Sequence, residues 1–121
     1  LVEQYKHGIG EICLEVPGGL SDGGAPLDEV KREISEETGY ESDNWEHLQT
    51  YINNPTRITN RIYAYIAHDA KKVTEQHLDP AEDITVHTLS IEDVLDAIKT
   101  GKISAVHSIA MIFHALSHIK S

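Results

Sequence analysis

The sequence predicts an α/β fold, because segments of strand-like composition alternate with segments of helical periodicity along a chain of 121 residues. Two strand-like segments come first, a helix follows, and a second pair of strand-like segments comes after it. A long polar loop, one further strand and two helices complete the chain. This order predicts one domain over residues 1–121, built as a sheet with helices on its faces.

The first two strands are expected at residues 1–7 and 11–16. The first alternates imperfectly between apolar and polar residues and is broken by Gly8 and Gly10. The second leads directly into a glycine-rich turn, where a backbone carbonyl near Gly18 is free to approach a ligand. The chain opens on Leu1 within the first strand, which suggests an N-terminally shortened piece of a longer protein.

The first helix is expected between Pro26 and Gly39. Proline suits a first helical position, and glycine suits the left-handed residue that closes a helix. Leu27, Val30 and Ile34 recur at three- and four-residue spacing and define one apolar face.

Carboxylates cover another face of this helix, at Glu29, Glu33, Glu36 and Glu37. Like charges three or four residues apart cost roughly 0.2–0.5 kcal/mol per pair. A hard divalent cation, which prefers oxygen ligands, would relieve this repulsion. The acidic face is therefore a candidate metal site.

The second half of the chain continues the α/β pattern. Residues 45–52 and 61–67 are expected to pair as a hairpin across a turn at 53–56, and residues 69–83 read as a long acidic loop. The remaining elements are a strand at 84–89, a helix at 90–99 with a capping box beginning at Ser90, and a last helix from about residue 104.

Composition excludes several classes of function. Twenty acidic residues against ten basic ones give a formal charge of −10, which argues against a nucleic-acid partner. The single cysteine, Cys13, excludes an internal disulfide and favours a reducing, cytoplasmic location. No apolar run approaches the ~20 residues that a membrane span requires, so no membrane association is expected.

Histidines also recur in the last helix, at His107, His114 and His118. A histidine pair four residues apart is able to hold zinc. No acidic or cysteine ligand is arranged with them in the sequence, so ordinary surface roles are the preferred interpretation.

The segment from Arg32 to Tyr40, REISEETGY, resembles the second half of a Nudix box, G-x5-E-x7-R-E-U-x-E-E-x-G-U, where U is a bulky apolar residue. On this alignment the box covers about residues 18–40 and opens at Gly18, but Gly24 stands where the family has its first glutamate. That glutamate is chiefly a partner of the box arginine. Asp22 and Glu29 are the two candidates to replace it beside Arg32.

Three further features resemble the ADP-ribose pyrophosphatase subfamily. The first strand resembles a V-x-Q-Y-R element with Lys6 at the arginine position, which implies a substrate phosphate contact. Pro55 lies fifteen residues after the box, near a subfamily marker position. Glu82 lies in an E-D-I element of the long loop and is the preferred loop acid, with three rivals, Glu75, Asp79 and Asp83.

The resemblance implies a Nudix-type α/β/α sandwich with a mixed sheet, an Mg²⁺ cofactor with Mn²⁺ as the alternative, a small-molecule nucleotide substrate and a homodimer. It implies hydrolysis of ADP-ribose to AMP and ribose 5-phosphate. The metal ligands implied are Glu33, Glu37, Glu36, Gly18 and Glu82, and the catalytic residues implied are Glu82, Glu36 and Arg32.

Two alternatives stay open. One is a Nudix hydrolase of another substrate, either a nucleotide sugar or a dinucleoside polyphosphate. The other is a non-catalytic Nudix-type binding module, which Gly24 favours and the intact glutamates of the second half of the box oppose.

Overall fold

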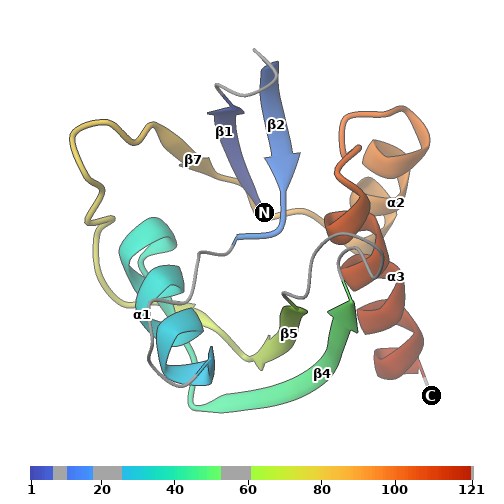
Figure 1. Ribbon diagram of the computed structural model, residues 1–121, viewed down its shortest axis with the longest axis horizontal. Helices are drawn as coiled ribbons and strands as arrows, with labels where there is room; N and C mark the ends of the chain where they lie inside the picture. The colour runs from blue at the N-terminus through green and yellow to red at the C-terminus, as the bar shows by residue number, and fades with distance from the viewer. Residues whose placement is uncertain (7–10, 18–25, 53–60, 121) are drawn as a thin grey trace.

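The computed structural model describes residues 1–6, 11–17, 26–52 and 61–120 (Figure 1). Four candidate residues of the sequence-based predictions, Gly18, Asp22, Gly24 and Pro55, lie outside the described part.

The described strands form three separate hydrogen-bonded groups. The first has the order β2-β1-β7, the second joins β3 to β6, and the third is the hairpin of β4 and β5. Their bounds are β1 Val2–Lys6, β2 Glu11–Glu15, β3 Tyr40–Glu41, β4 Asn44–Ile52, β5 Arg61–His68, β6 Lys71–Lys72 and β7 Ile84–Val86.

These pairings confirm the expected hairpin, in which Trp45 lies opposite Ala67 and Tyr51 lies opposite Ile62. Every pairing recorded between described strands is antiparallel. A mixed sheet, as expected from the sequence, requires parallel strand pairs, and the described residues contain none. Antiparallel neighbours need only short connections, whereas parallel ones need a crossover of about a dozen residues or more.

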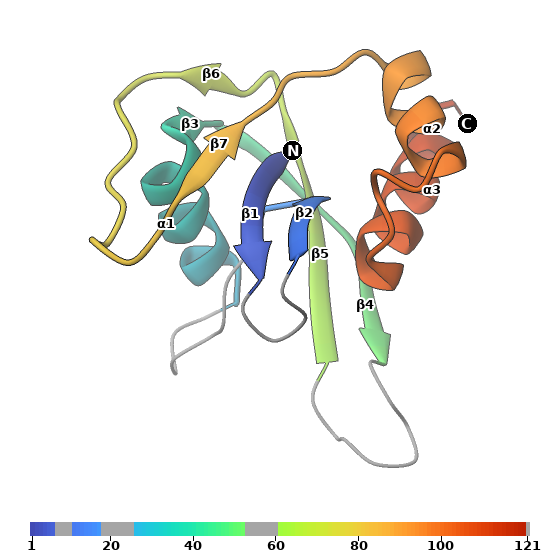
Figure 2. The same cartoon turned by 90° about the horizontal axis from the view of Figure 1, so that it is seen from above.

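Three helices, α1 Pro26–Thr38, α2 Ile91–Lys99 and α3 Val106–Lys120, were all expected from the sequence. Figure 2 shows α1 on one side of the strands, with α2 and α3 together on the other. This arrangement confirms the expected α/β architecture with helices on both faces. Among the described residues, no helix is long and apolar enough to cross a membrane.

The buried apolar side chains come from both halves of the chain. Among the described residues they are Val2 of β1, Ala64 of β5, Ile84 of β7, Ala97 of α2 and Ile103 between α2 and α3. Because β1 pairs with β7, the end of the acidic loop is held against the N-terminal strand.

The histidines of α3 contact three different partners. His107 lies 3.8 Å from Glu15, His114 lies 3.0 Å from the hydroxyl of Tyr51, and His118 lies 2.6 Å from Glu46. Because their partners lie on β2 and β4, these histidines do not converge on one point, which supports the surface roles preferred from the sequence.

Glu46 joins α3 to the hairpin, because its two carboxylate oxygens contact His68 at 2.8 Å and His118 at 2.6 Å. The hydrogen bond from His68 is the largest cause that lowers the pKa of Glu46 below the ordinary glutamate value, and the bond from His118 adds to it. A lowered carboxyl pKa stabilises the fold above the unfolded-state pKa, and this stabilisation is lost as the pH falls through the folded-state pKa.

We therefore expect Glu46→Gln to destabilise the protein near pH 7, and this difference from wild type to shrink as the pH falls below about 4. Urea unfolding midpoints measured between about pH 7 and pH 3 test this expectation. Glu75→Gln is the control, since that side chain is 89% exposed. A destabilisation by Glu46→Gln that stays undiminished at pH ~3 would show that its charge is not responsible.

Candidate active site

The acidic face of α1 places Glu33 and Glu37 one helical turn apart. Glu37 is almost fully buried at 8% exposure, and the side chain of Glu33 is 21% exposed. Asp28 and Glu29 lie in the first turn, where their negative charges interact favourably with the positive end of the helix dipole. These two acids stabilise the start of the helix, and the two deeper acids lie toward its end.

Arg32 forms ion pairs with three carboxylates of this face. Its guanidinium lies 2.7 Å from Glu29, 3.0 Å from Glu33 and 3.3 Å from Glu36. Hydrogen bonding to Glu29 is the largest cause that raises the pKa of Arg32. Of the two candidates for the missing partner of the box arginine, Glu29 is therefore the one that the structure places beside it, while Asp22 lies outside the described residues.

The loop between β6 and β7 closes the C-terminal end of α1. The last carbonyls of a helix have no partner within it, and here the loop supplies donors. The bonds are Val73 N to Gly39 O at 2.9 Å, His77 N to Glu36 O at 2.7 Å and the Gln76 side chain to Glu37 O at 2.7 Å. The end of the acidic helix and the acidic loop thus form one unit.

The same loop carries Glu82. Burial is the largest cause that raises the pKa of Glu33, and the nearby negative charges of Glu36 and Glu82 raise it further. Glu82 is held in place from within the loop, because its carboxylate accepts a hydrogen bond of 2.8 Å from the backbone N–H of Asp79.

The three rival loop acids, Glu75, Asp79 and Asp83, are exposed, whereas Glu82 is half-buried. Glu75 instead lies 3.8 Å from Lys72 at the surface. The geometry therefore favours Glu82 among the four acids that the sequence left open.

The donors at this site fit a hard cation by chemical type, since they are carboxylates that repel one another in a partly buried place. Among the described residues, no group of three or more His, Cys, Asp or Glu side chains is arranged to enclose a metal ion. Mg²⁺ is compatible with such a site, because it is usually held by one or two carboxylates together with water and substrate phosphates.

A model of the NUDIX domain matches residues 1–109 of the chain. The chain belongs to the Nudix family. The matched range contains the acidic helix and the acidic loop that carries Glu82. The helix is called the Nudix helix from here on.

The proteins similar to this chain include three with different names. A methanol dehydrogenase activator of Bacillus methanolicus is 32% identical over 105 residues, covering 85% of this chain and 57% of that protein. A GDP-mannose pyrophosphatase of Yersinia pestis is 31% identical over 126 residues, covering 98% and 64%. An ADP-ribose pyrophosphatase of Bacillus subtilis is 24% identical over 105 residues, covering 85% and 57%.

The chain thus spans less than two thirds of the length of these curated relatives. A solved structure, titled as the crystal structure of an ADP compounds hydrolase, aligns with a TM-score of 0.86 at 18% identity. It covers 98% of this chain and 64% of that one, and this likeness confirms the Nudix fold.

The structure does not bring every predicted site residue into view. Lys6 ends β1 opposite Glu11, but its side chain lies outside the described part, as do Gly18 and Pro55. Conversely, sequence reasoning missed Gln76, which contacts the end of the Nudix helix. A single amide inside an acidic loop without periodicity carries no signal that would have singled it out.

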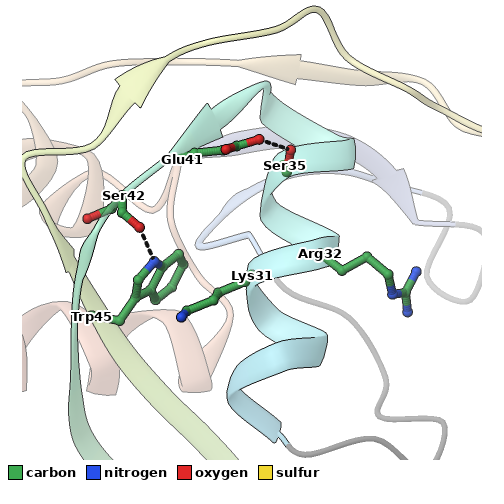
Figure 3. A pocket seen from close by; sticks show the side chains of 6 residues that line it. All are labelled: Lys31, Arg32, Ser35, Glu41, Ser42 and Trp45. Carbon is green, nitrogen blue, oxygen red and sulfur yellow. Dashed lines mark hydrogen bonds between the residues drawn. The ribbon is translucent and has the colours of Figure 1, made fainter.

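A pocket of about 300 Å³ lies between the Nudix helix and β4 (Figure 3), lined by Lys31, Arg32, Ser35, Glu41, Ser42 and Trp45. In Figure 3 the Lys31 side chain extends toward Trp45, whereas the Arg32 guanidinium points away from it. The Ser35 hydroxyl donates to Glu41 at 2.9 Å, and the Trp45 indole N–H donates to the Ser42 carbonyl at 2.9 Å. Two polar pairs of the lining thus satisfy each other, and neither Glu33 nor Glu37 lines this pocket.

Proposed function

We propose that the chain hydrolyses the pyrophosphate of a nucleoside diphosphate linked to another moiety, with ADP-ribose as the leading substrate. The observation that carries this proposal is the pair of largely buried carboxylates Glu33 and Glu37, one turn apart on the Nudix helix. Glu82 lies in the loop that contacts the end of this helix. Nudix hydrolases generally use divalent metal ions, and the acidic site is suited to one.

A bound Mg²⁺, with Mn²⁺ as the alternative, would neutralise pyrophosphate charge and lower the pKa of a water molecule. In this proposal Glu33 and Glu37 are its principal ligands, with Glu36, Glu82 and a backbone carbonyl near Gly18 as further ones. Glu33 and Glu37 suit this role because they are the less exposed carboxylates of the helix end.

In the reaction, a water oxygen bonds to one phosphorus and the bond from that phosphorus to the bridging oxygen breaks. Glu82 serves either as the base that takes the water proton or as the further metal ligand named above, and ADP-ribose yields AMP and ribose 5-phosphate. Arg32 stays charged and orients the carboxylates, since it contacts Glu33 and Glu36 and is anchored by Glu29. Lys6 and Pro55 are assigned to substrate binding from the family resemblance alone.

GDP-mannose is the second candidate substrate. The GDP-mannose pyrophosphatase of Yersinia pestis shares more identity with this chain, over more of its length, than the ADP-ribose pyrophosphatase of Bacillus subtilis does. Both substrates contain a nucleoside diphosphate, so the same acidic site would serve either one. The choice between them depends on contacts outside the Nudix helix.

A steady-state comparison of ADP-ribose, GDP-mannose and a diadenosine polyphosphate at saturating Mg²⁺ tests the substrate assignment. We expect kcat/KM for ADP-ribose to exceed that for the other two by at least about tenfold. A higher value for GDP-mannose would move the assignment to nucleotide sugars. No turnover of any of them by a folded chain would favour the non-catalytic binding module.

A further inference from the structure

Gln76 makes two hydrogen bonds that span the candidate active site. Its side-chain nitrogen donates to the carbonyl of Glu37 at 2.7 Å and to the carbonyl of Ile84 at 2.9 Å. The first carbonyl belongs to the buried glutamate near the end of the Nudix helix, and the second belongs to the first residue of β7. One side chain therefore joins the helix end to the strand that follows the acidic loop.

These two carbonyls lie next to the acids that the proposed reaction uses. Glu37 is a proposed metal ligand, and Glu82 precedes Ile84 by two residues. Glu82 lies in the same loop as Gln76, between the bonded amide and the strand that it reaches. A change in the separation of helix and loop would change the separation of the carboxylates that they carry.

Further bonds between loop and helix end are made by the backbone, from Val73 N and Thr74 N to Gly39 O and from His77 N to Glu36 O. They hold the segment 73–77 to the helix end, but they do not reach β7. The bond from Gln76 to Ile84 extends this attachment to the far end of the loop. Loss of the donor would leave two part-buried carbonyls without this partner, and each such loss weakens the local structure.

We propose that Gln76 is a positioning residue, which fixes the distance between Glu37 and Glu82 and thereby sets the affinity of the site for a divalent cation. This inference rests on the proposed function. It predicts that removing the amide donor weakens cation binding even where the protein remains folded. Partners that orient metal ligands typically affect metal affinity by roughly 10–100-fold when they are removed.

The test uses Gln76→Met, which retains the length of the side chain and loses the donor, and Gln76→Ala as a second variant. Gln49→Met is the matched control, since Gln49 is exposed on β4. Mn²⁺ binding is measured by calorimetry without substrate, and folding is checked by circular dichroism at the same temperature. The Mg²⁺ concentration for half-maximal rate and the KM for ADP-ribose are measured separately.

We expect both Gln76 variants to bind Mn²⁺ about tenfold or more weakly and to need correspondingly more Mg²⁺, with an unchanged KM at saturating Mg²⁺. Gln49→Met should match wild type. Wild-type Mn²⁺ affinity in folded Gln76→Met, with only a lowered unfolding midpoint, would overturn this inference while leaving the proposed function intact. A folded wild-type chain that neither binds Mn²⁺ nor hydrolyses any substrate would overturn both.

Discussion

Glu37→Gln is expected to lower kcat/KM for ADP-ribose by at least about 100-fold, because even outer partners of metal ligands contribute roughly 10–100-fold. Glutamine retains the size of the side chain but lacks the charge that a divalent cation requires. Glu37 is 8% exposed, and its backbone carbonyl would keep its bond to Gln76, so the fold should persist. Steady-state kinetics at several Mg²⁺ concentrations, with circular dichroism of each variant, measure this effect.

Glu92→Gln is the matched control, since Glu92 is an exposed acid of α2, on the other side of the strands from the Nudix helix (Figure 2). It should retain the wild-type rate. Full activity in folded Glu37→Gln would remove Glu37 from the metal site and leave the assignment of the Nudix helix without its principal ligand.

Gly39→Ala is expected to destabilise the protein by roughly 2–5 kcal/mol, from the left-handed backbone and the steric overlap together. Gly39 has φ of 76°, and an added Cβ would lie 2.1 Å from the carbonyl oxygen of Thr74. The loop cannot simply move away, because the Gly39 carbonyl accepts hydrogen bonds from Val73 and Thr74. Thermal and urea unfolding measure the loss, and turnover should fall with it because Glu82 lies in the same loop.

Gly101→Ala separates the two causes. Gly101 has φ of 85°, but an added Cβ there would meet nothing within 4 Å. Only the backbone cost of about 1–2 kcal/mol should remain. Equal destabilisation by both substitutions would show that the contact with Thr74 does not constrain the loop.

Much of the fold follows from local sequence patterns. Pro26 and Gly39 bound the Nudix helix as expected, and the alternating segments at 45–52 and 61–67 pair as a hairpin. The strands β3 and β6 were missed, because two residues carry no periodicity and their pairing is set by the loop that closes the helix. The strand expected at 84–89 ends at Val86, where its pairing with β1 ends.

The candidate site was predictable to the extent that it lies on one helix. The spacing of Glu33 and Glu37 follows from helical geometry alone. The contact between Glu29 and Arg32 needed side-chain geometry, because the sequence offered both Asp22 and Glu29 as partners. Gln76 reaches the helix through a tertiary contact, for which a polar loop offers no periodic pattern.

Product analysis of the purified chain with ADP-ribose, in Mg²⁺ and in excess chelator, tests the central claim most directly. AMP and ribose 5-phosphate should form in equal amounts, only when Mg²⁺ is present. Product formation at the same rate in excess chelator would contradict a metal-dependent site at Glu33 and Glu37. Absence of product from ADP-ribose and GDP-mannose alike, in a chain shown to be folded, would contradict the proposed hydrolysis itself.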